Sequence, residues 1–183
     1  MLNVKGAPVK STIQYITRQL GDRAAAFAAQ LPPGIKEWFS SPILATKTYS
    51  AEDLARLMEA YARTVGGDSE AVYVEMGRAS ADYSLTTIHR MFLAIGTPEM
   101  MVPRGAAAWN SYYDQGTMKA MTEGPGTAVM QLTGIQLPHR AICLRIAGWM
   151  ERFVDLASGR KAVILHTQCT LKGGSIEEWT GRW

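Results

Sequence analysis

The sequence lacks disulfide-forming cysteines in number, a membrane-spanning segment and a signal peptide. Only two of its 183 residues are cysteines, Cys143 and Cys169, which is too few for a disulfide framework. No apolar run approaches the roughly 20 residues that a membrane-spanning helix needs. The first ten residues also lack the apolar core of a signal peptide. We therefore expect a cytoplasmic protein without a membrane span.

The motifs of the common enzyme classes are also missing. The chain has no G-x-S-x-G nucleophile elbow and no glycine-rich phosphate loop between a strand and a helix. Cys143 falls on an amphipathic helical pattern, where we expect a buried, inert thiol. These absences predict that the chain is not an enzyme, has no catalytic residue and needs no cofactor.

Paired metal-ligand spacings such as C-x-x-C or H-E-x-x-H do not occur. His166 and Cys169 are three residues apart on a predicted strand, which places their side chains on opposite faces of the sheet. We therefore expect no metal. Residue chemistry still leaves open a site assembled from His139, His166, Cys169 and Glu177.

The basic residues form no cluster. The formal net charge is +3, and it arises from segments of opposite sign: +4 in 1–47, −3 in 48–96, −1 in 97–137 and +3 in 138–183. Nucleic-acid-binding proteins concentrate basic residues on one face, because their affinity comes from neutralising adjacent phosphates. The pattern therefore argues against a nucleic-acid partner and favours oppositely charged segments that pack together or against another protein.

Apolar residues make up 47% of the chain, enough for one globular domain over residues 1–183. Helical periodicity dominates its first two thirds, with Asp22 and Ser50 as predicted N-caps and a bend predicted near Gly77 or Ser80. Thr97 and Pro98 are predicted to restart a helix, and Arg78 and Asp82 to form a surface ion pair. The expected helices cover 11–20, 23–30, 35–39, 50–65, 69–95 and 106–113, with an extended stretch over 42–49.

An alternating pattern replaces the helical one after residue 116. Strands are expected over 117–122 and 127–133, a helix over 138–158, and two more strands over 161–171 and 175–183. Helices followed by a β-β-α-β-β order predict an α+β fold, in which the N-terminal helices pack with a small antiparallel sheet.

One segment combines flexible and aromatic side chains. Five of the ten methionines, at positions 100, 101, 118, 121 and 130, lie close to Trp109, Tyr112 and Tyr113. Methionine repacks easily, and aromatic residues with a polar atom suit pockets. The segment therefore forms an ordinary core, a homodimer interface or the wall of an apolar pocket. The candidate ligand-binding residues are Trp109, Tyr112, Tyr113, Met118 and, from the helix over 138–158, Trp149.

Short segments along residues 4–183 resemble a paralogous domain that is abundant in myxobacteria. That domain is similar to the 4-vinyl-reductase-type domain and, through it, to the haem NO-binding and TRAPP trafficking-subunit folds. The resemblance implies helices against an antiparallel sheet, often in a dimer and sometimes around a small apolar molecule. The segments that carry it are 4–6, 31–33, 77–81, 92–99, 109, 112–116, 138–139, 148–149 and 166–169.

Two departures limit what this resemblance implies. Related 4-vinyl-reductase-type domains often place a second cysteine after the glycine turn as part of a metal cluster. Here no cysteine follows Gly173 and Gly174. The Tyr-x-Ser-x-Arg signature of haem NO-binding domains is also absent, which argues against haem.

We therefore predict a non-catalytic sensory or ligand-binding domain for a small hydrophobic molecule, acting as a homodimer in signalling. The alternative is a protein–protein adaptor without a small ligand, and a third possibility is an enzyme for a tetrapyrrole-like substrate. The sequence identifies neither the ligand nor the partner nor the output of signalling.

Overall fold

The structure is a computed structural model that describes residues 1–87 and 98–183 of the chain. Its helices are α1 (Gly6–Leu20), α2 (Ala24–Ala29), α3 (Pro33–Ser40), α4 (Ala51–Val65), α5 (Ser69–Thr87), α6 (Pro98–Tyr112) and α7 (Arg140–Ser158). Its strands are β1 (Asn3–Lys5), β2 (Thr48–Ser50), β3 (Thr117–Gly124), β4 (Thr127–Thr133), β5 (Val163–Gln168) and β6 (Glu177–Arg182).

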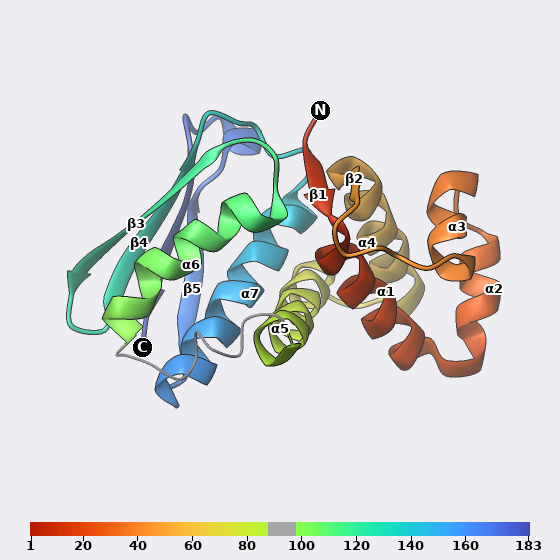
Figure 1. The fold of residues 1–183 in the computed structure, drawn as a ribbon, viewed down its shortest axis with the longest axis horizontal. Helices are drawn as coiled ribbons and strands as arrows, with labels where there is room; N and C mark the ends of the chain where they lie inside the picture. The colour runs from red at the N-terminus through yellow and green to blue at the C-terminus, as the bar shows by residue number, and fades with distance from the viewer. Residues whose placement is uncertain (88–97) are drawn as a thin grey trace.

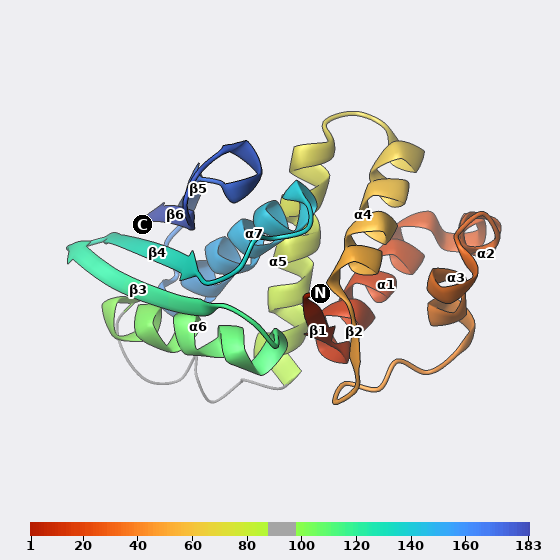
Figure 2. The ribbon, with the colours of Figure 1, turned by 90° about the horizontal axis from the view of Figure 1, so that it is seen from above.

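These elements form a helical lobe and a sheet lobe. Helices α1 to α5 make the first, and a four-stranded antiparallel sheet of order β3-β4-β6-β5 makes the second (Figure 1). Helices α6 and α7 cover the sheet, and α7 lies between the sheet and α5 (Figure 2). The small β1–β2 pair contacts both lobes, since Val4 also bridges to Tyr113 after α6. The predicted α+β fold with its antiparallel β-β-α-β-β half is confirmed.

Local sequence rules explain the two best-defined helices. The Ser50 hydroxyl accepts the backbone N–H of Asp53 at 3.1 Å and so caps α4, as predicted. Helix α7 ends at Gly159, whose φ of 68° lies in the left-handed region that glycine adopts without strain. Both helices bury an apolar stripe, and α7 buries more of its surface because it is covered on two sides.

Helices α5 and α7 approach each other through two glycines. A Cβ atom on Gly148 would lie 2.0 Å from the carbonyl oxygen of Val74, and one on Gly77 would lie 2.1 Å from that of Arg145. Helix α5 runs through Gly77 and Ser80 as one helix. The bend predicted there stays a prediction, and the missing side chain of Gly77 allows close packing.

Two predictions at the start of the chain are wrong. Helix α1 begins five residues earlier than expected, at Gly6, because Pro8 is tolerated in a first turn whose N–H groups have no partner within the helix. Asp22 lies in a 3-10 turn and does not cap α2. Arg23 occupies the capping position and makes no side-chain bond there.

Two further segments differ in length from the prediction. The helix expected over 106–113 is the second half of α6, which begins at Pro98. Of the extended stretch expected over 42–49, only its end joins β2. The helix expected up to residue 95 and the Thr97 cap lie outside the described residues.

The ion pair predicted between Arg78 and Asp82 is wrong. Arg78 contacts Glu75 on its own helix and Glu151 on α7, each at 2.5 Å. Asp82 contacts Arg152 on α7 at 2.7 Å. The close packing of α7 along α5 brings these partners nearer than the residue one turn away.

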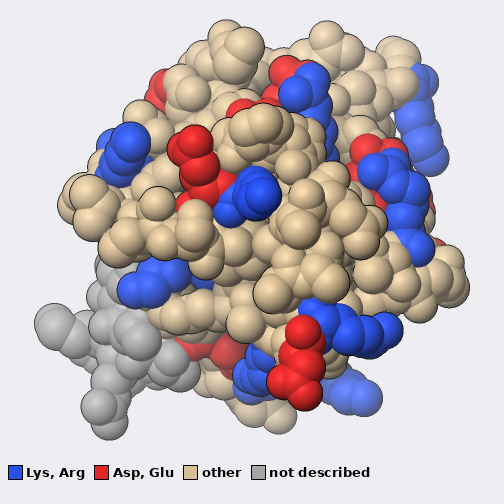
Figure 3. All heavy atoms as spheres, turned by 90° about the vertical axis from the view of Figure 1, so that its right-hand side faces the viewer, with Lys and Arg blue, Asp and Glu red and all other residues tan. Residues whose placement is uncertain are grey.

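The surface of the helical lobe shows charges of both signs. On the face in Figure 3, Lys and Arg are interspersed with Asp and Glu and form no continuous basic patch. Within the described part of the chain, no helix has the length and hydropathy needed to cross a membrane.

Candidate functional site

The five candidate ligand-binding residues meet around one cavity. Trp109 and Tyr112 come from α6 and Tyr113 directly follows it, while Met118 lies on β3 and Trp149 on α7. The cavity has a volume of about 50 Å³. The structure therefore brings together residues that are up to 40 positions apart in sequence. That a ligand binds among them stays a prediction.

The methionines of the same segment do not line the same surface. Met118 faces the cavity, but Met121, three positions along the same strand, points to the opposite face and is exposed. Met130 is buried in the core, and Met100 is exposed. The side chain of Met101 lies outside the described residues. The methionine cluster seen in the sequence is therefore not one wall in the structure.

The two indole rings present apolar surface to the cavity, because their N–H groups are bonded elsewhere. Trp109 stacks on Tyr113 with ring centres 4.0 Å apart, and its indole N–H donates to the carbonyl of Gln115 at 2.8 Å. The indole N–H of Trp149 donates to the Ser84 hydroxyl at 3.1 Å. Both indoles are thus fixed in orientation, which suits them to hold a guest of defined shape.

Arg145 is the charged residue of this cavity, and sequence reasoning did not select it. It lies on α7 with only 3% of its surface exposed. One terminal nitrogen, Nη2, donates to the Ser80 hydroxyl at 2.5 Å and to the Pro8 carbonyl at 3.3 Å. Its Nε is buried without a hydrogen-bond partner in the described structure. The sequence could have indicated this residue, since position 145 falls on the apolar helix face that Ile142 and Trp149 define.

No carboxylate among the described residues forms an ion pair with Arg145. Burial lowers the pKa of the guanidinium, and the nearby phenols of Tyr113 and Tyr112 offset part of that effect. Burial also raises the pKa of Tyr113, whose hydroxyl has no hydrogen-bond partner among the described residues. Proteins almost never bury arginine without an acidic partner, so this arrangement needs an explanation.

A second, larger cavity of about 170 Å³ adjoins the first. The two share Ala108 and Trp149 as lining residues, and the second continues towards Leu85 and Phe153. The ring of Trp149 stacks on Phe153 with centres 5.3 Å apart, so these side chains form a continuous aromatic wall. Together, the two cavities offer Arg145 at one end and a mostly apolar lining at the other, where Arg104 and Ser111 are the polar residues.

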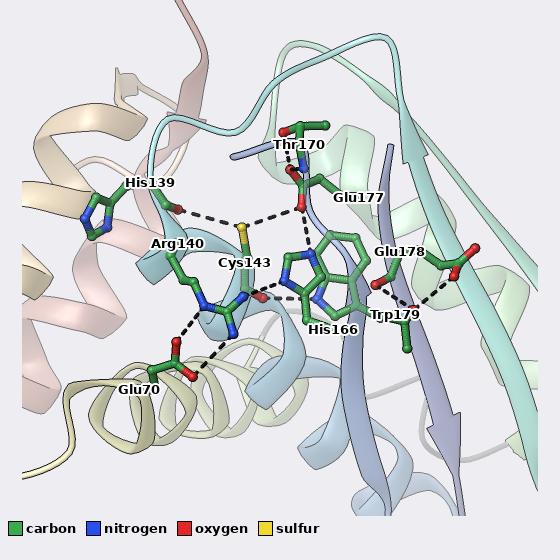
Figure 4. A network of polar contacts seen from close by, with 10 residues as sticks. Glu70, His139, Arg140, Cys143, His166, Thr170, Glu177, Glu178 and Trp179 are labelled. Atoms are coloured by element: carbon green, nitrogen blue, oxygen red, sulfur yellow. Dashed lines mark hydrogen bonds and ion pairs between the residues drawn. The ribbon is translucent and has the colours of Figure 1, made fainter. Parts of the chain in front are cut away.

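A separate polar cluster lies where α7 meets β5 and β6 (Figure 4). The Nε2 atom of His166 lies 2.7 Å from a carboxylate oxygen of Glu177, and the thiol of Cys143 lies 3.7 Å from the same oxygen. Thr170 donates its backbone N–H and its hydroxyl to the other Glu177 oxygen. Arg140 donates to Nδ1 of His166 at 2.9 Å.

Four metal-binding groups meet in this cluster. One ligand atom each from Cys143, His166, Cys169 and Glu177 lies within 4.8 Å of the other three. The prediction that His166 and Cys169 point to opposite faces is wrong, because β5 ends at Gln168 after a register irregularity and the chain then turns.

His139 does not belong to the cluster, although the sequence left it as a candidate. Its Nδ1 accepts the backbone N–H of Ala141 at 3.1 Å, so the side chain caps α7. Cys143, one turn further along α7, takes its place. Cys143 is buried, as expected for an inert thiol, but it is one of two thiols that point into the cluster.

Two thiols, an imidazole and a carboxylate match the number and type of ligands in a tetrahedral zinc site. Burial, followed by the Glu177 charge, raises the pKa of the Cys143 thiol, which favours its protonated form. Burial raises the pKa of Glu177, but hydrogen bonds from His166 and Thr170 outweigh it and hold the net pKa below its usual range. The residues of the cluster fit a zinc ion, which argues against the expectation that the chain binds no metal.

Comparison with known proteins shows the fold but no sequence family. No protein-family model and no curated protein sequence matches the chain. Among solved structures it is similar to an H-NOX protein from S. oneidensis in the Fe(II)NO ligation state, with a TM-score of 0.76 and 12% identity over 97% of this chain and 98% of that one. An unliganded Fe(II) H-NOX mutant from K. algicida matches with a TM-score of 0.72 and 11% identity, over 97% and 95%. An oxygen-binding H-NOX domain related to soluble guanylate cyclases matches with a TM-score of 0.72 and 10% identity, over 97% and 94%.

At such identities the likeness establishes an H-NOX-like fold alone. It agrees with the predicted resemblance to the haem NO-binding fold. Membership of the myxobacterial family stays a prediction.

Proposed function

We propose that this chain is a non-catalytic sensory domain that binds a small hydrophobic molecule in the cavity around Trp109 and Trp149. The convergence of the five candidate residues on one cavity is the observation that carries this proposal. The H-NOX-like fold supports it, because structures with this fold include complexes with nitric oxide and oxygen. Ligand binding in a fold of this kind favours a sensor over an enzyme.

Haem does not fit the described residues, although the neighbouring structures include haem proteins. No histidine or cysteine lines the cavities given above. His139 caps a helix, His166 is hydrogen-bonded within the polar cluster, and His89 lies outside the described residues. A cavity of about 50 Å³ is also far below the several hundred Å³ of cofactor pockets. The proposed ligand therefore binds directly to the protein.

A cavity-filling variant tests this function. Ala108 lines both cavities, whereas Asn110 on the same helix is exposed. The probes are small alcohols, amides and carboxylates, from isobutanol to benzoate, measured by the thermal shift of the protein. We expect Ala108→Phe to abolish the shifts that wild type shows, and Asn110→Phe to retain them. Equal shifts in both variants, or none in wild type together with no organic molecule in native mass spectra, would contradict the proposal.

The homodimer is part of the same proposal. Strand β5 lies at the edge of the sheet and exposes Val163 and Leu165, at 57% and 61% of their surfaces. Unpaired edges with apolar side chains favour pairing with another chain. We expect sedimentation to show a dimer for wild type and a monomer for Leu165→Lys.

The same edge is the observation that favours the adaptor alternative. In that case Leu165→Lys would abolish capture of another protein while every small probe fails to bind wild type.

A further inference from the structure

We propose that the ligand carries a carboxylate, that its oxygens bind the guanidinium of Arg145, and that its apolar remainder lies against Trp149. This inference rests on the proposed function, because it names the chemical class of molecule that the same cavity takes. Three observations support it. Arg145 is buried without an acidic partner in the described part of the chain, its guanidinium has unused hydrogen-bond donors, and the two cavities limit the size of the ligand.

Arg145 is not needed by the groups that it contacts. The Pro8 carbonyl also accepts the hydroxyl of Thr12 at 2.9 Å. The Ser80 hydroxyl has a second partner in Ser11, at 2.9 Å. Removing the guanidinium would therefore leave neither buried acceptor without a donor. Local structure alone does not explain a buried cation here.

The hydrogen-bond donors of Arg145 that have no acceptor in the described structure indicate which chemical group the cavity binds. The guanidinium is planar and offers five N–H groups in a fixed fork that matches the two oxygens of a carboxylate. The Nε–H of Arg145 and the hydroxyl of Tyr113 make no hydrogen bond of good geometry among the described residues, although the phenol lies close enough to interact with the guanidinium. An anion placed there would satisfy both donors and supply the absent negative charge. A neutral, purely apolar guest would leave them unsatisfied.

The cavities limit the size of the molecule. The one at Arg145, about 50 Å³, holds a head group of a few heavy atoms, and the one beyond Trp149 measures about 170 Å³. A cavity of about 150 Å³ is known to bind benzene. The two together suit a small aromatic or branched-chain monocarboxylate. The carboxylate lies at Arg145, and the apolar remainder extends towards Leu85 and Phe153, in a cavity whose lining also includes Arg104.

Matched pairs of probes test the inference on wild-type protein. Isovalerate, benzoate and phenylacetate are compared with isovaleramide, benzamide and phenylacetamide by calorimetric titration. Each pair has nearly the same shape and differs in charge. We expect each carboxylate to bind roughly 10- to 100-fold more tightly than its amide, because a hydrogen bond to a charged group is worth more than a neutral one.

Two arginine variants identify the residue responsible. In Arg145→Met the carboxylate preference disappears, whereas in Arg152→Met, also on α7 but paired with Asp82 away from the cavity, it is retained. Arg145→Met should unfold at the same temperature as wild type or higher, because it removes an unpaired buried cation. A large loss of thermal stability would instead give Arg145 a structural role and overturn the inference.

The two proposals fail in different ways. If amides and carboxylates bind equally and Ala108→Phe abolishes both, a ligand-binding cavity exists and only the carboxylate inference is overturned. If no probe binds wild type and no organic molecule copurifies with it, the proposed function fails, and this inference with it.

Discussion

The protonation of His166 follows from the groups around it. Arginine can only donate, so Nδ1 must accept from Arg140, and Nε2 then carries the proton that Glu177 accepts (Figure 4). Glu70 holds Arg140 in place through a contact of 2.6 Å. The His166 imidazole is therefore hydrogen-bonded at both of its nitrogens.

A metal would compete with that arrangement. Coordination through Nε2 displaces its proton, and a neutral imidazole then carries a proton on Nδ1, where Arg140 also donates. We predict that added zinc binds one ion per chain at the cluster and that Arg140→Ala tightens this binding. Calorimetric titration measures the affinity, and Cys169→Ser should weaken it at least tenfold.

A control variant separates this effect from a general loss of structure. Arg63 also forms an ion pair, with Glu59 on α4, and lies outside the cluster. Arg63→Ala should leave zinc affinity unchanged. Zinc binding that is equal in wild type, Cys169→Ser and Arg140→Ala would show that the four residues do not form a metal site.

At the scale of elements, the contact between α5 and α7 positions the cavity. Gly77 faces the backbone of Arg145, and Ser80, one turn on, contacts the Arg145 side chain. The closeness of the two helices thus decides where the guanidinium lies. Sequence periodicity shows that both helices have apolar faces but does not give the distance between them.

Substituting Gly148 tests this contact. Its Cβ would lie 2.0 Å from the carbonyl oxygen of Val74, so the helices must separate. We predict that Gly148→Ala lowers the free energy of unfolding by about 3 kcal/mol, at the upper end of typical overpacking costs, despite the higher helix propensity of alanine. Urea denaturation measures this change.

The matched control is Gly34 on α3, where no atom lies within 4 Å of the position that a Cβ would occupy. Gly34→Ala should be neutral or stabilise the fold by up to about 1 kcal/mol. An equal effect of the two substitutions would show that α5 and α7 can separate at little cost.

At the scale of the whole molecule, the fold class could be predicted from the sequence. The succession of strands and helix after residue 116, the Ser50 cap and the Gly159 stop depend on local rules that the structure confirms. Four of the five cavity residues were found because aromatic and flexible side chains concentrate in one segment, and Trp149 was added from the helix over 138–158. That they bind a ligand stays a prediction.

The remaining parts of the site depend on contacts that local patterns do not encode. Arg145 looks like one charged residue on a helix until packing encloses it without an acid. Cys143 joins His166 and Cys169 only through the docking of α7 on the sheet and an irregular end of β5. Long-range geometry of this kind requires the assembled structure.

The arrangement of the two lobes gives the last prediction. Enlarging the Arg145 cavity to hold a porphyrin would require α6 and α7 to move away from α1 and α5, against the close contact at Gly148. We predict that haemin added to the protein forms no stoichiometric complex that survives gel filtration, as judged by the Soret absorbance. Apomyoglobin serves as the positive control, and Cys169→Ser excludes binding at the polar cluster. A stable complex with one haem per chain would show that the lobes open, and that the ligand need not bind the protein directly.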